Sequence, residues 1–119
     1  RIFQDFKFLV EQCREQVPDL RLYIIGSKPS VARWAIAEQM QRNNAMIQDY
    51  CRAKPGFTYI DVWPQLLDGN GQVRPELFME DELHLNSAGY DRWTAAIAPV
   101  LLRGEAAFEL NKRTLDVVD

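Results

Sequence analysis

A short apolar run between two amphipathic segments limits the folds that this chain can adopt. The run is Leu-Tyr-Ile-Ile, Leu22–Ile25, inside a β-prone stretch from Leu20 to Pro29 that Gly26 and Pro29 end. Its apolar residues follow one another directly, which is typical of a strand buried on both faces in a parallel sheet covered by helices. Phe57–Trp63 is predicted to form a second strand.

Helices are predicted before, between and after these strands. Apolar residues recur every three or four positions in Arg1–Val17, and again from Ser30, a candidate N-cap, to about Lys54. A third helix is predicted to start at Asn86 or Ser87. The order helix, strand, helix, strand, helix predicts an α/β fold with two parallel strands, three main helices and right-handed crossovers.

The sheet that these strands can form is incomplete. Two strands make a poor sheet on their own, and a strand as apolar as Leu22–Ile25 needs a hydrogen-bonded neighbour on each side. Either more sheet lies outside these residues or a second copy of the chain supplies it. We therefore expect a homodimer joined across this strand, or association with a missing N-terminal half.

The composition excludes several classes of protein. The 119 residues, 47% of them hydrophobic, fit one domain with a real core. A net charge of −3 without a basic stripe argues against a nucleic-acid partner. No apolar run approaches the ~20 residues that a transmembrane helix needs. Any signal peptide would lie upstream of Arg1, so a cytoplasmic and an exported location both stay open.

Metal ligands are scarce. With one histidine and two distant cysteines, Cys13 and Cys51, no zinc-ligand spacing can be assembled. We expect Cys13 and Cys51 to be two semi-buried thiols on helices. A disulfide between them would require an oxidising compartment and the close approach of both helices.

Three segments converge in the predicted fold. In open α/β sheets, ligands bind beyond the carboxyl ends of the strands. This rule places Ser27–Trp34, Asp61–Pro64 and the loop that carries Asp81 and His84 around one crevice.

His84, the only histidine, stands three residues after Asp81. An imidazole is the simplest general base near neutral pH, and a carboxylate at this spacing can bond Nδ1, fix the tautomer and stabilise the imidazolium. The other interpretation is a surface histidine beside an acidic stretch near a helix start. The bare pattern leaves both interpretations open.

Longer strings around these residues resemble a known family. DELHLNSAGYDRW, residues 81–93, resembles the last conserved block of the SGNH (GDSL-type) hydrolases, where an Asp-x-x-His pair precedes the C-terminal helix. KPSVARW, RNNAMI, YIDVWPQLLDGNG and PELFMEDELHLNSAGY look like successive stretches of one bacterial branch of these esterases and lipases. The resemblance covers residues 2–102 and leaves a tail at 103–119, in which AAFEL is a candidate helix.

The resemblance implies a function and a limit to it. It makes this chain the C-terminal half of a flavodoxin-like three-layer α/β/α domain, with His84 as the base that activates a serine and Asp81 as its orienting carboxylate. The family's Gly-Asp-Ser block with the nucleophile, its second-block glycine and its Gly-x-Asn-Asp block do not occur in this chain. The oxyanion hole belongs to those blocks, so we expect little or no hydrolysis by these residues alone.

Substrates and cofactors follow from the same resemblance. A small-molecule, lipid or sugar ester is the implied substrate class, and no metal or organic cofactor is implied. The contrasting hypothesis is a non-catalytic ligand-binding or assembly module derived from the same fold. A Gly-Asp-Ser block upstream of Arg1 would support the hydrolase, and an initiator methionine directly before Arg1 would support the module.

Other residues of the crevice have competing interpretations. Ser27 follows a strand, but Lys28 and Pro29 come next and no Gly-x-Ser-x-Gly elbow surrounds it, so we do not expect it to be the nucleophile. Cys13 and Cys51 lie on helix faces that are predicted to be part of the core, so we do not expect either of them to be the nucleophile.

Lys28, Arg33, Trp34 and Trp63 are candidates for lining the crevice, the last three as substrate-binding residues. The alternative is that both tryptophans are packing residues and that Arg33 is a solvated charge.

Three polar residues are expected to have structural roles. Asn43 and Asn44 are poor helix formers in the middle of a helix, so one of them is expected to bond a neighbouring loop. Asp61, at a strand end, is expected to be a turn or cap acceptor.

Overall fold

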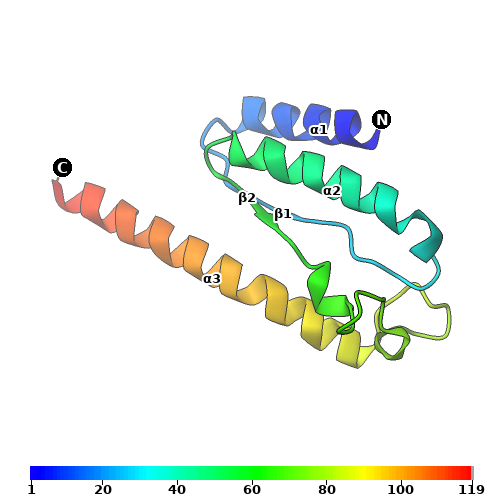
Figure 1. The fold of residues 1–119 in the computed structure, drawn as a ribbon. Coiled ribbons are helices and arrows are strands. Elements are labelled where there is room, and N and C mark those ends of the chain that lie inside the picture. Colours follow the sequence, from blue (N-terminus) through cyan, green and yellow to red (C-terminus); the bar gives the residue numbers. More distant parts are fainter. Residues whose placement is uncertain (119) are drawn as a thin grey trace.

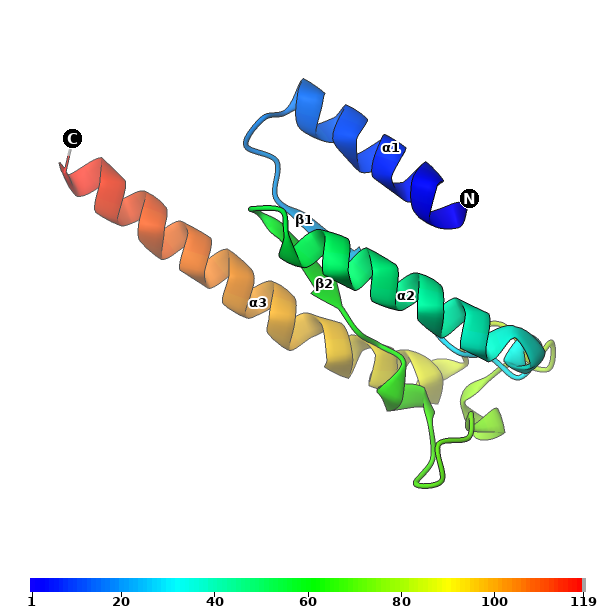
Figure 2. The same ribbon diagram turned by 45° about the horizontal axis from the view of Figure 1, so that its top comes forward.

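The computed structural model describes residues 1–118, and the side chains of residues 1–111. Its helices and strands are α1 (Ile2–Gln16), β1 (Leu22–Ile25), α2 (Ala37–Arg52), β2 (Phe57–Ile60) and α3 (Ser87–Val118). Short 3₁₀ turns occupy Trp34–Ile36, Pro64–Leu66 and Pro75–Leu77. Figure 1 shows α1 and α2 on one side of the two strands and α3 on the other, and Figure 2 shows the same layers from a second direction.

The two strands pair in parallel, in register from Leu22 opposite Phe57 to Ile25 opposite Ile60. The predicted α/β class, with two parallel strands and three main helices of a partial three-layer domain, is confirmed. Each strand is four residues long, so β2 ends before Asp61 and the chain enters the crevice earlier than predicted.

The prediction that Ser30 caps the second helix is wrong. The Ser30 hydroxyl accepts a hydrogen bond from the Arg33 amide at 3.2 Å, but this closes a local turn, and α2 begins only at Ala37. The Ala32 amide donates to the Glu82 carbonyl at 3.0 Å, so the segment after Ser30 is tied to a distant loop. This tertiary contact fixes the path of the chain here, which passes through a 3₁₀ turn at Trp34–Ile36 before α2 begins.

One of the predicted polar contacts, from the middle of the second helix to a neighbouring loop, is confirmed. The Asn44 side chain, on α2, bonds both the amide and the carbonyl of Ser27, each at 3.0 Å. This pair fixes the backbone just beyond β1 to the helix above it. In the Asp-Gly-Asn-Gly turn, the Asp68 carboxylate accepts from the Asn70 and Gln72 amides at 2.8 and 3.0 Å.

The buried core lies mostly under the loops that follow β2. Two clusters of buried apolar side chains share the partly buried Trp93 of α3 as a common neighbour. The larger cluster contains Leu66, Val73, Leu77, Phe78 and Leu85. The smaller cluster contains Ile60, Val62 and Ile97.

The opposite edge of β1 is open. The Leu22 and Gly26 amides donate to Gly56 and Ile60 carbonyls on the β2 side, and β1 has no other strand neighbour among residues 1–118. The Cα radius of gyration is 16.9 Å, whereas a compact domain of this length has about 13.5 Å. The end of α3 projects beyond the other elements (Figure 1) and lengthens the molecule, whose long axis is 55 Å.

Helix α3 runs without a break through residue 103, where the tail was predicted to begin. The Glu105 carboxylate accepts from the Arg21 guanidinium and from the Tyr23 hydroxyl, the latter at 3.0 Å. The Arg21 guanidinium also lies 3.5 Å from the centre of the Phe108 ring. These contacts attach the first part of the predicted tail to the start of β1, and Asp119 lies outside the described residues.

None of the described helices combines the length and the apolar character that crossing a bilayer demands.

Candidate active site

The three segments predicted to converge are in contact. The Lys28 ammonium donates to the Leu83 carbonyl at 2.8 Å, and Trp34 stacks on Trp63 with ring centres 6.2 Å apart. The parallel pairing of β1 with β2 brings these segments together, because both strands end at the same side of the sheet.

The loop that carries Asp81 and His84 is a tight reversal of the chain. Phe78 pairs with Leu85 in an isolated antiparallel bridge, and both side chains are buried in the larger cluster. Inside this bridge, the Met79 amide donates to the His84 carbonyl at 2.8 Å. The apolar base of the loop is therefore fixed in the core, and its polar tip faces solvent.

Asn86 joins this loop to α3. Its side-chain oxygen accepts from the Gly89 amide at 2.9 Å, which confirms the predicted helix cap. Its side-chain nitrogen donates to the carbonyls of Glu76 and Phe78, at 2.8 and 3.3 Å. One side chain thus connects the start of α3 to the backbone that leads into the loop.

Gly89 allows α3 to begin against the loop. A Cβ at this position would lie 2.2 Å from the Leu77 carbonyl oxygen and 2.8 Å from Leu85 Cδ2. The same carbonyl accepts the Asn86 amide at 3.0 Å, so it cannot move away without losing a hydrogen bond. A residue without a side chain is required here by close approach.

Asp81 accepts three hydrogen bonds at the tip. Its Oδ2 lies 2.5 Å from His84 Nδ1, and its Oδ1 accepts from the Leu83 and His84 amides at 3.0 Å each. The imidazole bond first, and then the two amides, hold the pKa of this carboxyl well below its usual range. Asp81 is therefore ionised at neutral pH and faces one side of the imidazole.

This arrangement determines which imidazole nitrogen is available. A carboxylate only accepts hydrogen bonds, so Nδ1 carries the hydrogen and the Nε2 lone pair of the neutral ring is free. The His84 side chain is 67% exposed, so this lone pair can receive a proton from a group brought against it. Among the described side chains, Asp81 alone bonds the His84 imidazole.

Glu82, between the two, has φ 61°, the left-handed conformation that residues other than glycine and asparagine rarely adopt. Such a conformation persists only where surrounding contacts impose it, and it is concentrated at functional sites. Here the Glu82 amide donates to the Met79 carbonyl at 2.9 Å, and the Glu82 carbonyl accepts from the Ala32 amide at 3.0 Å.

The candidate substrate-binding residues separate into two groups. Trp63 is 5% exposed and also lines a cavity, and Trp34 packs against the larger core cluster. Arg33 is exposed, and its amide donates to the Ser30 hydroxyl.

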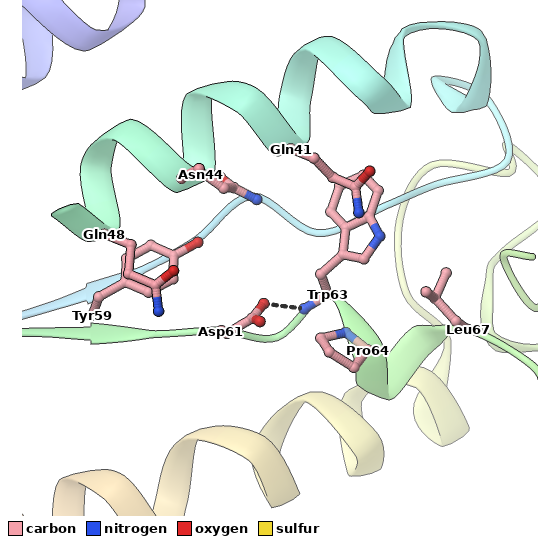
Figure 3. A pocket seen from close by; sticks show the side chains of 9 residues that line it. Gln41, Asn44, Gln48, Tyr59, Asp61, Trp63, Pro64 and Leu67 are labelled. Atoms are coloured by element: carbon pink, nitrogen blue, oxygen red, sulfur yellow. Dashed lines mark hydrogen bonds between the residues drawn. The ribbon is translucent and has the colours of Figure 1, made fainter. Parts of the chain in front are cut away.

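A cavity of about 310 Å³ lies between α2 and the chain that leaves β2 (Figure 3). Asp61 faces it and accepts the Trp63 amide at 3.0 Å, which confirms the predicted turn acceptor. Burial raises the pKa of Tyr59, which lines the same cavity, to about 12. Neither Asp81 nor His84 is among the residues that line this cavity.

The two cysteines differ in burial. Cys13 is half-buried on α1 as predicted, whereas Cys51 is fully buried on α2, where burial raises the pKa of its thiol. Ser27 is exposed, and its backbone is held by Asn44. Among the described residues, no group of three or more histidine, cysteine or acidic side chains is arranged to hold a metal ion.

Sequence reasoning missed the roles of Lys28 and Gly89. Lys28 was only a candidate for lining the crevice, but its ammonium bonds the backbone beside His84. Its position directly after a strand end was the one available signal. For Gly89 the signal was a glycine in the first turn of a helix, where glycine is a poor helix former.

Comparison with known proteins identifies the family. Residues 1–92 match the GDSL-like Lipase/Acylhydrolase family. The chain belongs to this family. The resemblance drawn from residues 81–93 is thereby confirmed at the level of the family, and no curated protein matches the chain.

This chain spans only 50–60% of the length of the solved structures that it resembles. They include a proposed platelet activating factor from Streptococcus pneumonia, 20% identical with a TM-score of 0.71, which matches over 83% of this chain and 50% of its own. The esterase domain of the zebrafish ZfL2-1 retrotransposon ORF1 protein is 24% identical with a TM-score of 0.66. The match covers 84% of this chain and 60% of that domain. A proposed acylhydrolase from Bacteroides fragilis is 17% identical with a TM-score of 0.68. The match covers 85% of this chain and 50% of the acylhydrolase.

Substitution of Gly89 tests the close approach of α3 to the loop. We expect Gly89→Ala to lower the free energy of unfolding by about 1–3 kcal/mol, since the new methyl group displaces a hydrogen-bonded carbonyl. Gly69→Ala is the control, because a Cβ at Gly69 meets nothing within 4 Å. Denaturant unfolding followed by tryptophan fluorescence measures the free energy of unfolding of both variants and of the wild type. Equal effects of the two substitutions would contradict the close approach.

The Asp81 carboxylate is expected to stabilise the fold in a pH-dependent way. Its pKa is lower in the folded chain than in the unfolded one, where it is about 3.9. The contribution is therefore complete above about pH 4 and is lost as the pH falls below that value. The difference in free energy of unfolding between wild type and Asp81→Asn should shrink in acid. Asp49→Asn, at an exposed carboxylate of α2, should show a small difference throughout.

Proposed function

We propose that this chain carries the acid–base half of a serine hydrolase that cleaves carboxylic esters. His84 takes the proton from a serine hydroxyl as it attacks the ester carbonyl, and then returns it to the leaving alcohol. Water repeats the cycle on the acyl-enzyme. Asp81 holds the imidazole in the tautomer that leaves Nε2 free and stabilises the imidazolium.

The 2.5 Å contact between Asp81 Oδ2 and His84 Nδ1 is the observation that supports this proposal best. The contact lies on a loop whose base is fixed by buried residues, and the side of the imidazole away from Asp81 faces solvent. Membership of a lipase and acylhydrolase family supports the reaction class. A small-molecule, lipid or sugar ester remains the proposed substrate.

The nucleophile and the oxyanion donors are proposed to come from outside these 119 residues. The solved structures have 40–50% of their length beyond the part that this chain matches. An enzyme that lacks its nucleophile keeps only residual catalysis from binding and electrostatics. The isolated chain is accordingly proposed to be inactive.

The activity test uses the polypeptide as encoded, a short-chain aryl ester and a fluorophosphonate probe that labels activated serines. We expect His84→Ala to lower kcat by about 10³-fold or more and to abolish labelling, because the serine loses its base. Glu80→Ala, at an exposed side chain of the same loop, should retain both. Hydrolysis that is unaffected by His84→Ala would contradict the proposed role. An encoded polypeptide with neither hydrolysis nor labelling would support the non-catalytic module.

We infer in addition that the N-terminal half of the same domain docks on the open edge of β1. Ile25 is 40% exposed on the α3 side of the sheet. Cys13, Val17 and Leu22 line a largely apolar groove on the α1 side. An occupant that covers both places must continue the sheet and its helices on both faces, which favours the rest of a three-layer domain over a single added peptide.

Hydrogen exchange tests this docking at single residues. Amides alternate in direction along a strand, so Tyr23 and Ile25 point to the open edge while Leu22 and Gly26 bond to the β2 side. In the 119-residue chain, Leu22 and Gly26 should be protected and Tyr23 and Ile25 should exchange freely. The complete polypeptide should protect all four.

Two results would overturn the docking. Protection of Tyr23 and Ile25 in the 119-residue chain that rises with concentration, together with a dimer mass by sedimentation, would assign the edge to a second copy. Free exchange of both amides in the complete polypeptide would show that nothing covers the edge.

A further inference from the structure

We propose that Lys28 is a positioning residue for His84, an inference that rests on the proposed function. Lys28 follows β1, and its side chain reaches the loop at residues 81–84 from a segment more than fifty residues earlier in the chain. It does not contact the imidazole itself. It holds the backbone that sets the distance between Asp81 and His84.

The contact is made at the peptide unit that joins Leu83 to His84. The carbonyl of this unit accepts the Lys28 ammonium at 2.8 Å, and its amide donates to Asp81 Oδ1 at 3.0 Å. One peptide plane is therefore held at both ends, by a cation on one side and by the orienting carboxylate on the other.

The preceding peptide unit, from Glu82 to Leu83, is held in the same way. Its carbonyl accepts the Ala32 amide at 3.0 Å, and its amide donates to Asp81 Oδ1 at 3.0 Å. The segment 28–32 thus supplies a donor to each of two successive carbonyls, while Asp81 accepts both successive amides. This pairing explains how Glu82 is kept in its left-handed conformation.

The surroundings of Lys28 favour a fixed side chain. Its ammonium lies 5.7 Å from the centre of the buried Phe78 ring, at the base of the same loop. Partial burial, and then the charge of Arg33, lower the pKa of Lys28, while the charge of Asp81 raises it. A cation drawn from water into this place needs the acceptor that the Leu83 carbonyl provides.

The tautomer of His84 reports directly on this arrangement. Because His84 is the only histidine, long-range proton–nitrogen NMR correlations of the 119-residue chain give one set of imidazole signals. With the ring neutral, a bond to Asp81 keeps the hydrogen on Nδ1, whereas an imidazole without this partner shares it between both nitrogens. The fraction of the Nδ1–H form measures positioning without requiring any catalysis.

We expect wild type to be mainly in the Nδ1–H form and Lys28→Met to lose most of this preference. Methionine keeps an apolar stem against Phe78 but has no donor for the Leu83 carbonyl. Lys28→Arg, which restores a cationic donor, should recover the preference at least in part. Lys54→Met removes an equal charge from an exposed lysine that lies over Tyr50, and should leave the tautomer unchanged.

Asp81→Asn separates this inference from the proposed function. If Asp81→Asn changes the tautomer and Lys28→Met does not, the positioning role of Lys28 is wrong and the Asp81–His84 pair stands. If Asp81→Asn also leaves the tautomer unchanged, the pair itself is wrong, and both proposals fall.

Folding of each variant is checked by its amide spectrum. Should Lys28→Met not fold, Lys28→Gln, whose shorter stem cannot reach the Leu83 carbonyl, takes its place and should show the same loss. Failure of both variants to fold would assign Lys28 to the stability of the fold and would overturn the proposal.

Discussion

Parallel pairing of β1 with β2 is the constraint on which the site depends. Because both strands run in the same direction, the segments after Ile25 and Ile60 leave the sheet at the same side. The first of these segments reaches the loop at residues 81–84 through Lys28 and Ala32. An antiparallel partner would have placed these ends on opposite sides, and the donors that hold the loop would have been absent.

The sequence predicted those parts of the fold that depend on local patterns. Periodic apolar residues identified the three helices, and residue chemistry identified Asp61 as a turn acceptor. The loop contact was predicted for Asn43 or Asn44 and the start of the third helix for Asn86 or Ser87, and the structure assigns them to Asn44 and Asn86. In each case the polar residue bonds backbone close to where the local pattern placed it. The pairing of Asp81 with His84 belongs to the same class, because three residues separate the partners.

Features set by distant residues could not be predicted. The second helix begins at Ala37 and not at Ser30, and the segment before it is bonded through the Ala32 amide to Glu82, fifty residues later. The attachment of α3 to β1 depends on Arg21 and Glu105, which no periodicity connects. In both places the bonded residues are more than forty positions apart, so only the assembled structure shows that they meet.

The site and the sheet have different degrees of independence. The loop of Asp81 and His84 stands on a buried cluster contributed entirely by this chain, so its geometry needs no outside residue. The sheet has one paired and one open edge, and both faces beside Ile25 and Leu22 are uncovered. Orientation of the His84 imidazole is therefore a local property of these residues, because Asp81 and the buried cluster beneath the loop all belong to this chain. The open edge of β1 is different, because among residues 1–118 no strand pairs with it.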